Sequence, residues 1–164
     1  MDLYPWVVLT HVLAAFGFAV SHGVSAFAAF AIRRERDPVR LKALLDLSGS
    51  SLIWLYVTLL VVVIAGIVAA VMHGWFGSVW PWAAIVLLVL IIGAMFGLAT
   101  RYYATIRQAI GMPSSADKKG EPPAAPLPPD ELARLLDTRR PEAIALVGFG
   151  GLALLIWLME MKPF

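Results

Sequence analysis

The 164-residue sequence contains no cysteine, and this absence excludes several kinds of site. Disulfides, iron–sulfur clusters and metal sites built from thiolates all need cysteine sulfur. Histidine, which binds metals and haem through a neutral ring nitrogen, occurs three times, as His11, His22 and His73. The candidate cofactor-binding residues of this chain are these three histidines.

Charged residues are also scarce, at 15% of the chain, whereas 60% of the residues are hydrophobic. Soluble domains contain roughly 45–50% apolar residues. The long apolar runs contain no Asp, Glu, Lys or Arg in their cores. Proton-driven transporters and pumps usually place carboxylates there, so that class is disfavoured. The sequence also lacks a phosphate-binding glycine loop, an H-x-x-x-H pair and a nucleophile elbow, so we expect no catalytic residues.

Four long apolar runs dominate what is present. Residues 52–71 contain no charge, and as a helix these twenty residues span ~30 Å, the thickness of a bilayer's hydrocarbon core. A helix satisfies its own backbone hydrogen bonds in lipid. We therefore predict an all-α fold, an integral membrane four-helix bundle that forms one domain over residues 1–164. Its spans lie at about 3–32, 52–73, 81–103 and 143–160.

The distribution of positive charge predicts the orientation of these spans. Twelve of the thirteen Lys and Arg residues lie in or beside the two long connections, and Lys162 lies at the opposite end of the spans. Positive charge concentrates in cytoplasmic loops. We therefore expect both termini outside the cytoplasm, in a bacterial cytoplasmic (inner) membrane. Because this topology already accounts for the positive charges, we expect no nucleic-acid binding. The first span lacks the basic leader of a signal peptide, so we expect it to be retained.

The two long connections each predict a short amphipathic helix at the cytoplasmic surface. In the first, Asp37 is a plausible N-cap for a helix with Leu41, Leu44 and Leu45 on one face. This helix lies at the interface or runs straight into the second span, and residues 48–51 permit a bend. The second connection begins with a proline-rich linker over 112–129. A helix over 130–140 follows it, and Pro141 ends that helix.

Small residues recur at helical spacing in all four spans, which is typical of helices that pack closely in lipid. They pack either within the chain or against another subunit, and the sequence does not separate these two readings. The stripes are Gly17, Ser21, Ser25 and Ala29; Gly66 and Ala70; Gly93 and Gly97; and Gly148, Gly150 and Gly151.

The histidines permit two readings. His11 and His22 lie near one face of the first span, ~16 Å apart along the axis, and an ionisable residue at membrane depth is a functional candidate. A b-type haem could be held by His11 with His73 or His22, and Met95 is a weak partner for His22. Alternatively, His22 is a satisfied polar residue, hydrogen-bonded to neighbours such as Ser25 or Tyr56, or it contacts a proton or a quinone.

A third candidate is a copper site at the extracytoplasmic ends of the spans. Methionine and histidine together suit Cu(I). The candidate ligands are Met72, His73, Met159 and Met161, with Met1 nearby in the same predicted layer.

The run HVLAA at 11–15, the small-residue pattern through Gly23 and the segment RRERDPVRLKALLDLSG at 33–49 resemble a group of small bacterial predicted integral membrane proteins. That group is distantly similar to the membrane part of copper-resistance protein D and to HemJ-type protoporphyrinogen oxidases. The resemblance covers roughly residues 5–110. It implies a four-helix membrane bundle with a histidine in the first helix, and a haem contact at His11.

From these observations the leading hypothesis is a non-catalytic accessory or scaffolding component of a membrane assembly. Its partners would be lipid and either further copies of the chain or a larger membrane complex. The alternatives are a haem- or quinone-linked redox protein and a copper-handling protein.

Overall fold

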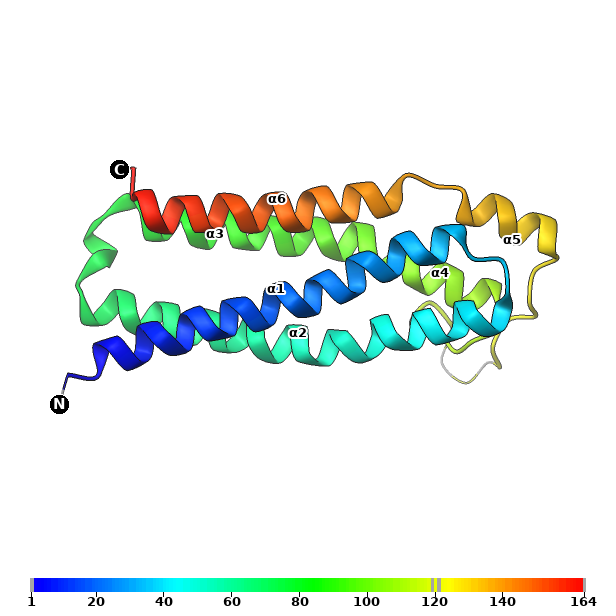
Figure 1. Cartoon of the computed structure of the whole chain (residues 1–164), viewed down its shortest axis with the longest axis horizontal. Coiled ribbons are helices and arrows are strands. Elements are labelled where there is room, and N and C mark those ends of the chain that lie inside the picture. Colours follow the sequence, from blue (N-terminus) through cyan, green and yellow to red (C-terminus); the bar gives the residue numbers. More distant parts are fainter. Residues whose placement is uncertain (1, 119, 121, 164) are drawn as a thin grey trace.

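The chain folds entirely into helices in a computed structural model that describes residues 2–118, 120 and 122–163 (Figure 1). The elements, in chain order, are α1 (Tyr4–Arg34), α2 (Pro38–Met72), the 3₁₀ turn η1 (Trp75–Gly77), α3 (Val79–Met95), the π-helical turn η2 (Phe96–Thr100), α4 (Arg101–Ala109), α5 (Pro129–Leu136) and α6 (Arg140–Met161). The all-α prediction is confirmed.

Four stretches of helix are long and apolar enough to cross a membrane: 4–34, 38–72, 80–109 and 129–161. Most of their side chains face outward. Large apolar residues such as Phe16, Trp54 and Phe96 are each more than 65% exposed. An outward apolar surface of this extent suits lipid rather than water. We therefore describe the protein as a multi-pass membrane protein.

The helix expected over 38–47 is not a separate element. Asp37 caps it as predicted, because its Oδ1 accepts a hydrogen bond from the Val39 amide at 2.8 Å. The helix then continues without a break through residues 48–51 into the second span. The bend that these residues permit is absent. The hydroxyls of Ser50 and Ser51 donate to carbonyls three residues earlier, and the Ser48 hydroxyl lies 2.9 Å from the Ser25 hydroxyl of α1, which holds this part of α2 against α1.

The third span is also longer than its apolar run. The elements α3, η2 and α4 follow one another without a gap, and the π-helical turn is the one irregularity among them. Gly111 follows the end of this rod with a positive φ of 73°, a backbone conformation that glycine adopts without strain.

The proline at 141 has a different place from the one predicted. The preceding helix, α5, ends at Leu136, and Pro141 lies in the first turn of α6 instead of ending α5. Proline suits that position because the first helical amides have no partner to lose. Leu132 and Leu136 of α5 are buried, so this amphipathic helix packs on protein.

Both termini lie at one end of the bundle, here called the terminal end, and the connection over 110–128 lies at the other, here called the connector end (Figure 1). α1 packs mainly on α2, and α3 packs mainly on α6. The buried core lies at the connector end, where Ile32, Leu41 and Leu136 are almost completely excluded from solvent. Arg33 joins α1 to this end of α6 through an ion pair with Glu142.

Candidate functional site

A cavity of about 590 Å³ lies between the helices, and its walls come from α1, α2, α3, α4 and α6. It lies within the range of about 300–1,000 Å³ that is typical of small-molecule sites. The lining runs along the third span from Leu88 to Arg107, nineteen positions or roughly 28 Å of helix. Pro113 and Ser115 of the connection also line it. The cavity is therefore elongated and reaches the connector end.

A hydrogen-bonded group ties three helices together beside this cavity. The Ser25 hydroxyl of α1 lies 2.9 Å from the Ser48 hydroxyl of α2. The Tyr103 hydroxyl of α4 donates to the Ser25 carbonyl oxygen at 2.6 Å and lies 3.3 Å from the Ser25 hydroxyl. Ser25 and Tyr103 both line the cavity. These bonds fix the distance between α1, α2 and α4 at this depth.

Arg107 lies one helical turn beyond Tyr103 toward the connector end and also lines the cavity. Its Nη2 donates to the Leu45 carbonyl at 2.9 Å and lies 3.5 Å from the Asp46 carboxylate. The Arg107 side chain is only 24% exposed, whereas that of Asp46 is 54% exposed. The cavity therefore carries a largely enclosed positive charge at one end.

His22 contributes the second unusual polar group. Its side chain is 4% exposed, it lines the cavity, and its Nε2 has no hydrogen-bond partner among the described residues. The ring is packed between Phe18 and Phe149, with ring centroids 6.3 Å and 4.9 Å away. One of the alternatives for His22 was a satisfied polar residue, hydrogen-bonded to neighbours such as Ser25 or Tyr56, and Nε2 makes no such bond. The helix spacing turns the hydroxyls of Ser25 and Tyr103 toward one another instead.

The three histidines do not meet. His11 donates from Nδ1 to the Val62 carbonyl at 2.8 Å. The ring also lies against Gly66, seven residues before His73 on α2, which places the His11 ring roughly 10 Å from His73 along that helix. The His73 ring stacks on Tyr4, with centroids 4.1 Å apart, and His22 lies further along α1 in the cavity wall. No pair is placed across one haem-sized gap, so each histidine is a separate candidate.

The proposed copper ligands lie at the terminal end, in an aromatic environment. The His73 ring is 4.9 Å from the Trp75 ring, and the Lys162 ammonium lies 4.5 Å above Trp75. Lys162 therefore adds a positive charge to the aromatic group that His73 also contacts, which is unfavourable for a cation site. Met72 and Met161 are exposed, Met159 is partly buried, and Met1 falls outside the described residues. Among the described residues, no group of three His, Cys, Asp or Glu could hold a metal ion.

Glycines explain how the histidines fit. A Cβ placed on Gly148 would lie 1.9 Å from Nε2 of His22, and one on Gly66 would lie 3.0 Å from the His11 ring. Each ring therefore occupies space that any other residue on the facing helix would fill. By contrast, a Cβ on Gly93, Gly97 or Gly150 would meet nothing within 4 Å. The small-residue stripes thus have a packing role in the chain at some positions and an open face at others.

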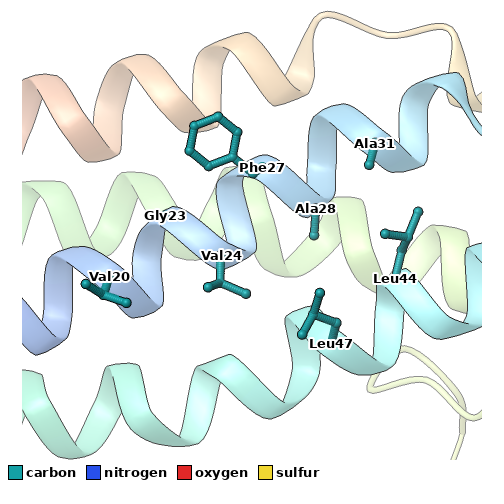
Figure 2. A pocket seen from close by; sticks show the side chains of 8 residues that line it. All are labelled: Val20, Gly23, Val24, Phe27, Ala28, Ala31, Leu44 and Leu47. Atoms are coloured by element: carbon teal, nitrogen blue, oxygen red, sulfur yellow. The ribbon is translucent and has the colours of Figure 1, made fainter.

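A second hollow lies in the angle between α1 and α2, with a volume of about 560 Å³ (Figure 2). Its eight lining residues are glycine, alanine and larger apolar side chains, among them Val20, Phe27 and Leu47. It offers no polar group to orient a ligand, so it is a weaker site than the interhelical cavity.

The patterns in the sequence did not predict Arg107 and Tyr103 as site residues. The signal was present in part. Arg107 lies one turn from Tyr103 on the same helix, so the two residues share a face. Which way that face points depends on the π-helical turn η2, because an additional residue per turn rotates everything that follows it.

Comparison with known proteins identifies no relative: no protein-family model, no curated protein and no solved structure matches this chain. The resemblance to copper-resistance protein D and HemJ-type proteins therefore stays an expectation from the sequence.

Proposed function

We propose that this protein binds a lipid-soluble small molecule in the cavity between its helices. The observation that carries the proposal is the combination of mostly apolar walls with one polar group that the protein uses only in part, the guanidinium of Arg107. Apolar walls with a few convergent polar groups are the usual form of a small-molecule site.

The test is to fill the cavity. Leu59 lines it, whereas its neighbour Leu60 is 60% exposed on the outer surface. The two substitutions Leu59→Trp and Leu60→Trp therefore add the same bulk to the inside and to the outside of one helix. The purified full chain in lipid nanodiscs is titrated with a dansyl-labelled fatty acid. We expect saturable binding that Leu59→Trp abolishes and Leu60→Trp preserves. Equal binding by both variants would refute the proposal.

A second candidate is the accessory role that the sequence favours, and one observation supports it. Gly93 and Gly97, one helical turn apart in the third span, have open space where side chains would lie. Such a face permits close approach of a helix from another subunit. Replacing both glycines with leucine should then dissociate an oligomer or complex seen by native mass spectrometry. The same change at Ile85 and Val89, both exposed, serves as the control.

We also propose that the connector end faces the cytoplasm of a bacterium and that both termini lie outside. The support is the concentration of Lys and Arg at that end. Alkaline phosphatase, which is active outside the cytoplasm, should be active when fused to either terminus. A green fluorescent protein fused at the same positions through the same export route should stay dark. The opposite pattern would reverse the assignment.

A further inference from the structure

The guanidinium of Arg107 is only partly used by the protein. An arginine side chain carries five N–H donors. Of the three guanidinium nitrogens of Arg107, only Nη2 makes hydrogen bonds with described residues, to the carbonyl of Leu45 and weakly to Asp46. Nε and Nη1 are left with no partner in a side chain that is 24% exposed. Neither atom is among the buried atoms without a partner, so both remain accessible, and an anion that enters the cavity can accept charge-assisted hydrogen bonds from them.

Asp46 does not neutralise this charge fully. Its carboxylate is 54% exposed and lies 3.5 Å from Nη2, at the limit of a hydrogen bond. A pair of this geometry at a protein surface contributes little. An anionic group entering the cavity can therefore bind Arg107 through Nε and Nη1 without first breaking a strong ion pair.

The rest of the cavity is lined mainly by apolar side chains. Away from Arg107 the lining becomes aliphatic, with Leu59, Leu88 and Leu155 among its walls. A volume of about 590 Å³ spread along roughly 28 Å leaves a mean cross-section near 21 Å². Carbon atoms pack at about 4 Å, so this section holds one extended chain and not two side by side.

We propose that the ligand is an anionic amphiphile with a single hydrocarbon chain, whose headgroup is bound by Arg107 at the connector end while its chain lies along the third span. This inference rests on the proposed function and names the ligand class of the same cavity. A carboxylate and a phosphate monoester share the required chemistry, since both accept hydrogen bonds from a guanidinium. A neutral quinone or alcohol does not carry this charge.

The experiment compares ligands that differ only in the headgroup. Oleate, oleyl phosphate and oleyl alcohol compete with the dansyl-labelled fatty acid for the full chain in nanodiscs of zwitterionic lipid. A charge-assisted hydrogen bond contributes enough for about a tenfold effect or more. We expect at least one of the two anions to compete about tenfold better than the alcohol, and the better of the two identifies the headgroup. Equal competition by all three ligands would overturn the inference.

Two arginine variants assign the effect to one side chain. Arg107→Gln should remove the advantage of the anions, whereas Arg101→Gln, which deletes the same charge from an exposed residue outside the lining, should preserve it. Arg107→Lys keeps the charge and should retain part of the preference. If Arg107→Gln and Arg101→Gln behave alike, the membrane surface and not this site selects the anion, and the inference is wrong.

The two proposals fail in different ways. If the alcohol binds as well as the anions and Leu59→Trp blocks both, the cavity is a ligand site but the headgroup assignment is wrong. If none of the ligands competes and Leu59→Trp binds the dansyl probe like Leu60→Trp, the proposed function itself is wrong. Circular dichroism of each variant shows whether the helices are intact, and the Arg107→Lys variant keeps the inference testable if Arg107→Gln does not fold.

Discussion

At the scale of single residues, the contact between His22 and Gly148 is the tightest that the structure shows for a glycine. A Cβ on Gly148 would lie 1.9 Å from Nε2 of the ring, which no side chain tolerates without movement. This contact ties α1 to α6 in the wall of the cavity. Position 148 must therefore be glycine as long as the imidazole of His22 occupies this place.

We therefore predict that Gly148→Ala destabilises the protein. Overpacking of this kind costs about 1–3 kcal/mol. Gly150→Ala is the matched control, because it lies on the same helix with nothing within 4 Å and should be neutral or slightly stabilising. Thermal unfolding in detergent, followed by circular dichroism, measures both. Adding His22→Ala to Gly148→Ala removes the clash, so the double variant should lose less stability than the sum of the two single changes.

Glu35 offers a prediction about pH, in the turn between α1 and α2. Its carboxylate accepts hydrogen bonds from the amides of Asp37 and Arg36, at 3.0 Å and 2.8 Å, and these bonds lower the pKa of Glu35 below its ordinary value. Arg40 acts in the same direction from 3.9 Å. A lowered pKa means that the ionised group stabilises the folded state above the ordinary pKa. This contribution disappears as the pH falls through the lower, folded-state pKa.

Glu35→Gln should therefore lower the unfolding temperature at neutral pH by a small amount and have no effect in strong acid. The measurement is the difference in unfolding temperature between the wild type and the variant across the acid range. A difference that grows as the pH falls would contradict the assignment.

At the scale of elements, α5 shows how a short helix contributes to the bundle. Leu136 is completely buried in the core at the connector end, together with Leu41 and Ile106. We predict that Leu136→Ala destabilises the protein by about 2–5 kcal/mol, the usual cost of removing a buried leucine. Leu154→Ala on α6, where the side chain is 54% exposed, should have a much smaller effect. Equal losses in unfolding temperature would show that α5 does not anchor the chain.

The elements also show what the sequence could and could not predict. Apolar runs of twenty residues and the Asp37 cap are local signals, and the helices followed from them. The fate of residues 48–51 depended on Ser48 meeting Ser25 of another helix, which no local signal reveals. Pro141 was equally ambiguous, because proline suits both the end of one helix and the start of the next.

At the scale of the whole molecule, the cavity exists because the helices associate in two pairs, α1 with α2 and α3 with α6, held together at the connector end. The sequence predicts a stripe of small residues on each span, but it does not show which stripes face one another. Gly151 meets Ile91 of α3, whereas Gly93 meets nothing. The candidate site could not be predicted for this reason: its lining is the surface that this pairing leaves uncovered.

Because the chain has no cysteine, introduced pairs of cysteines can test this arrangement without background. The Ser25 and Ser48 hydroxyls are 2.9 Å apart, which suits a disulfide once both are cysteine. Oxidation of Ser25→Cys with Ser48→Cys should block labelling by a maleimide-linked polymer. Ser25→Cys with Ser50→Cys is the control, since Ser50 is exposed on another face of α2, and it should stay fully labelled.

The same reasoning tests the second pair of helices. Ile91→Cys with Gly151→Cys places sulfur atoms where the Ile91 side chain now lies against the α6 backbone, so oxidation should join α3 to α6. Ile91→Cys with Gly150→Cys should not cross-link, because a side chain at 150 meets no neighbour. If instead the two controls cross-link and the predicted pairs do not, the helices pair differently. The cavity between them would then have other walls, and both Arg107 and His22 would lose their assigned places.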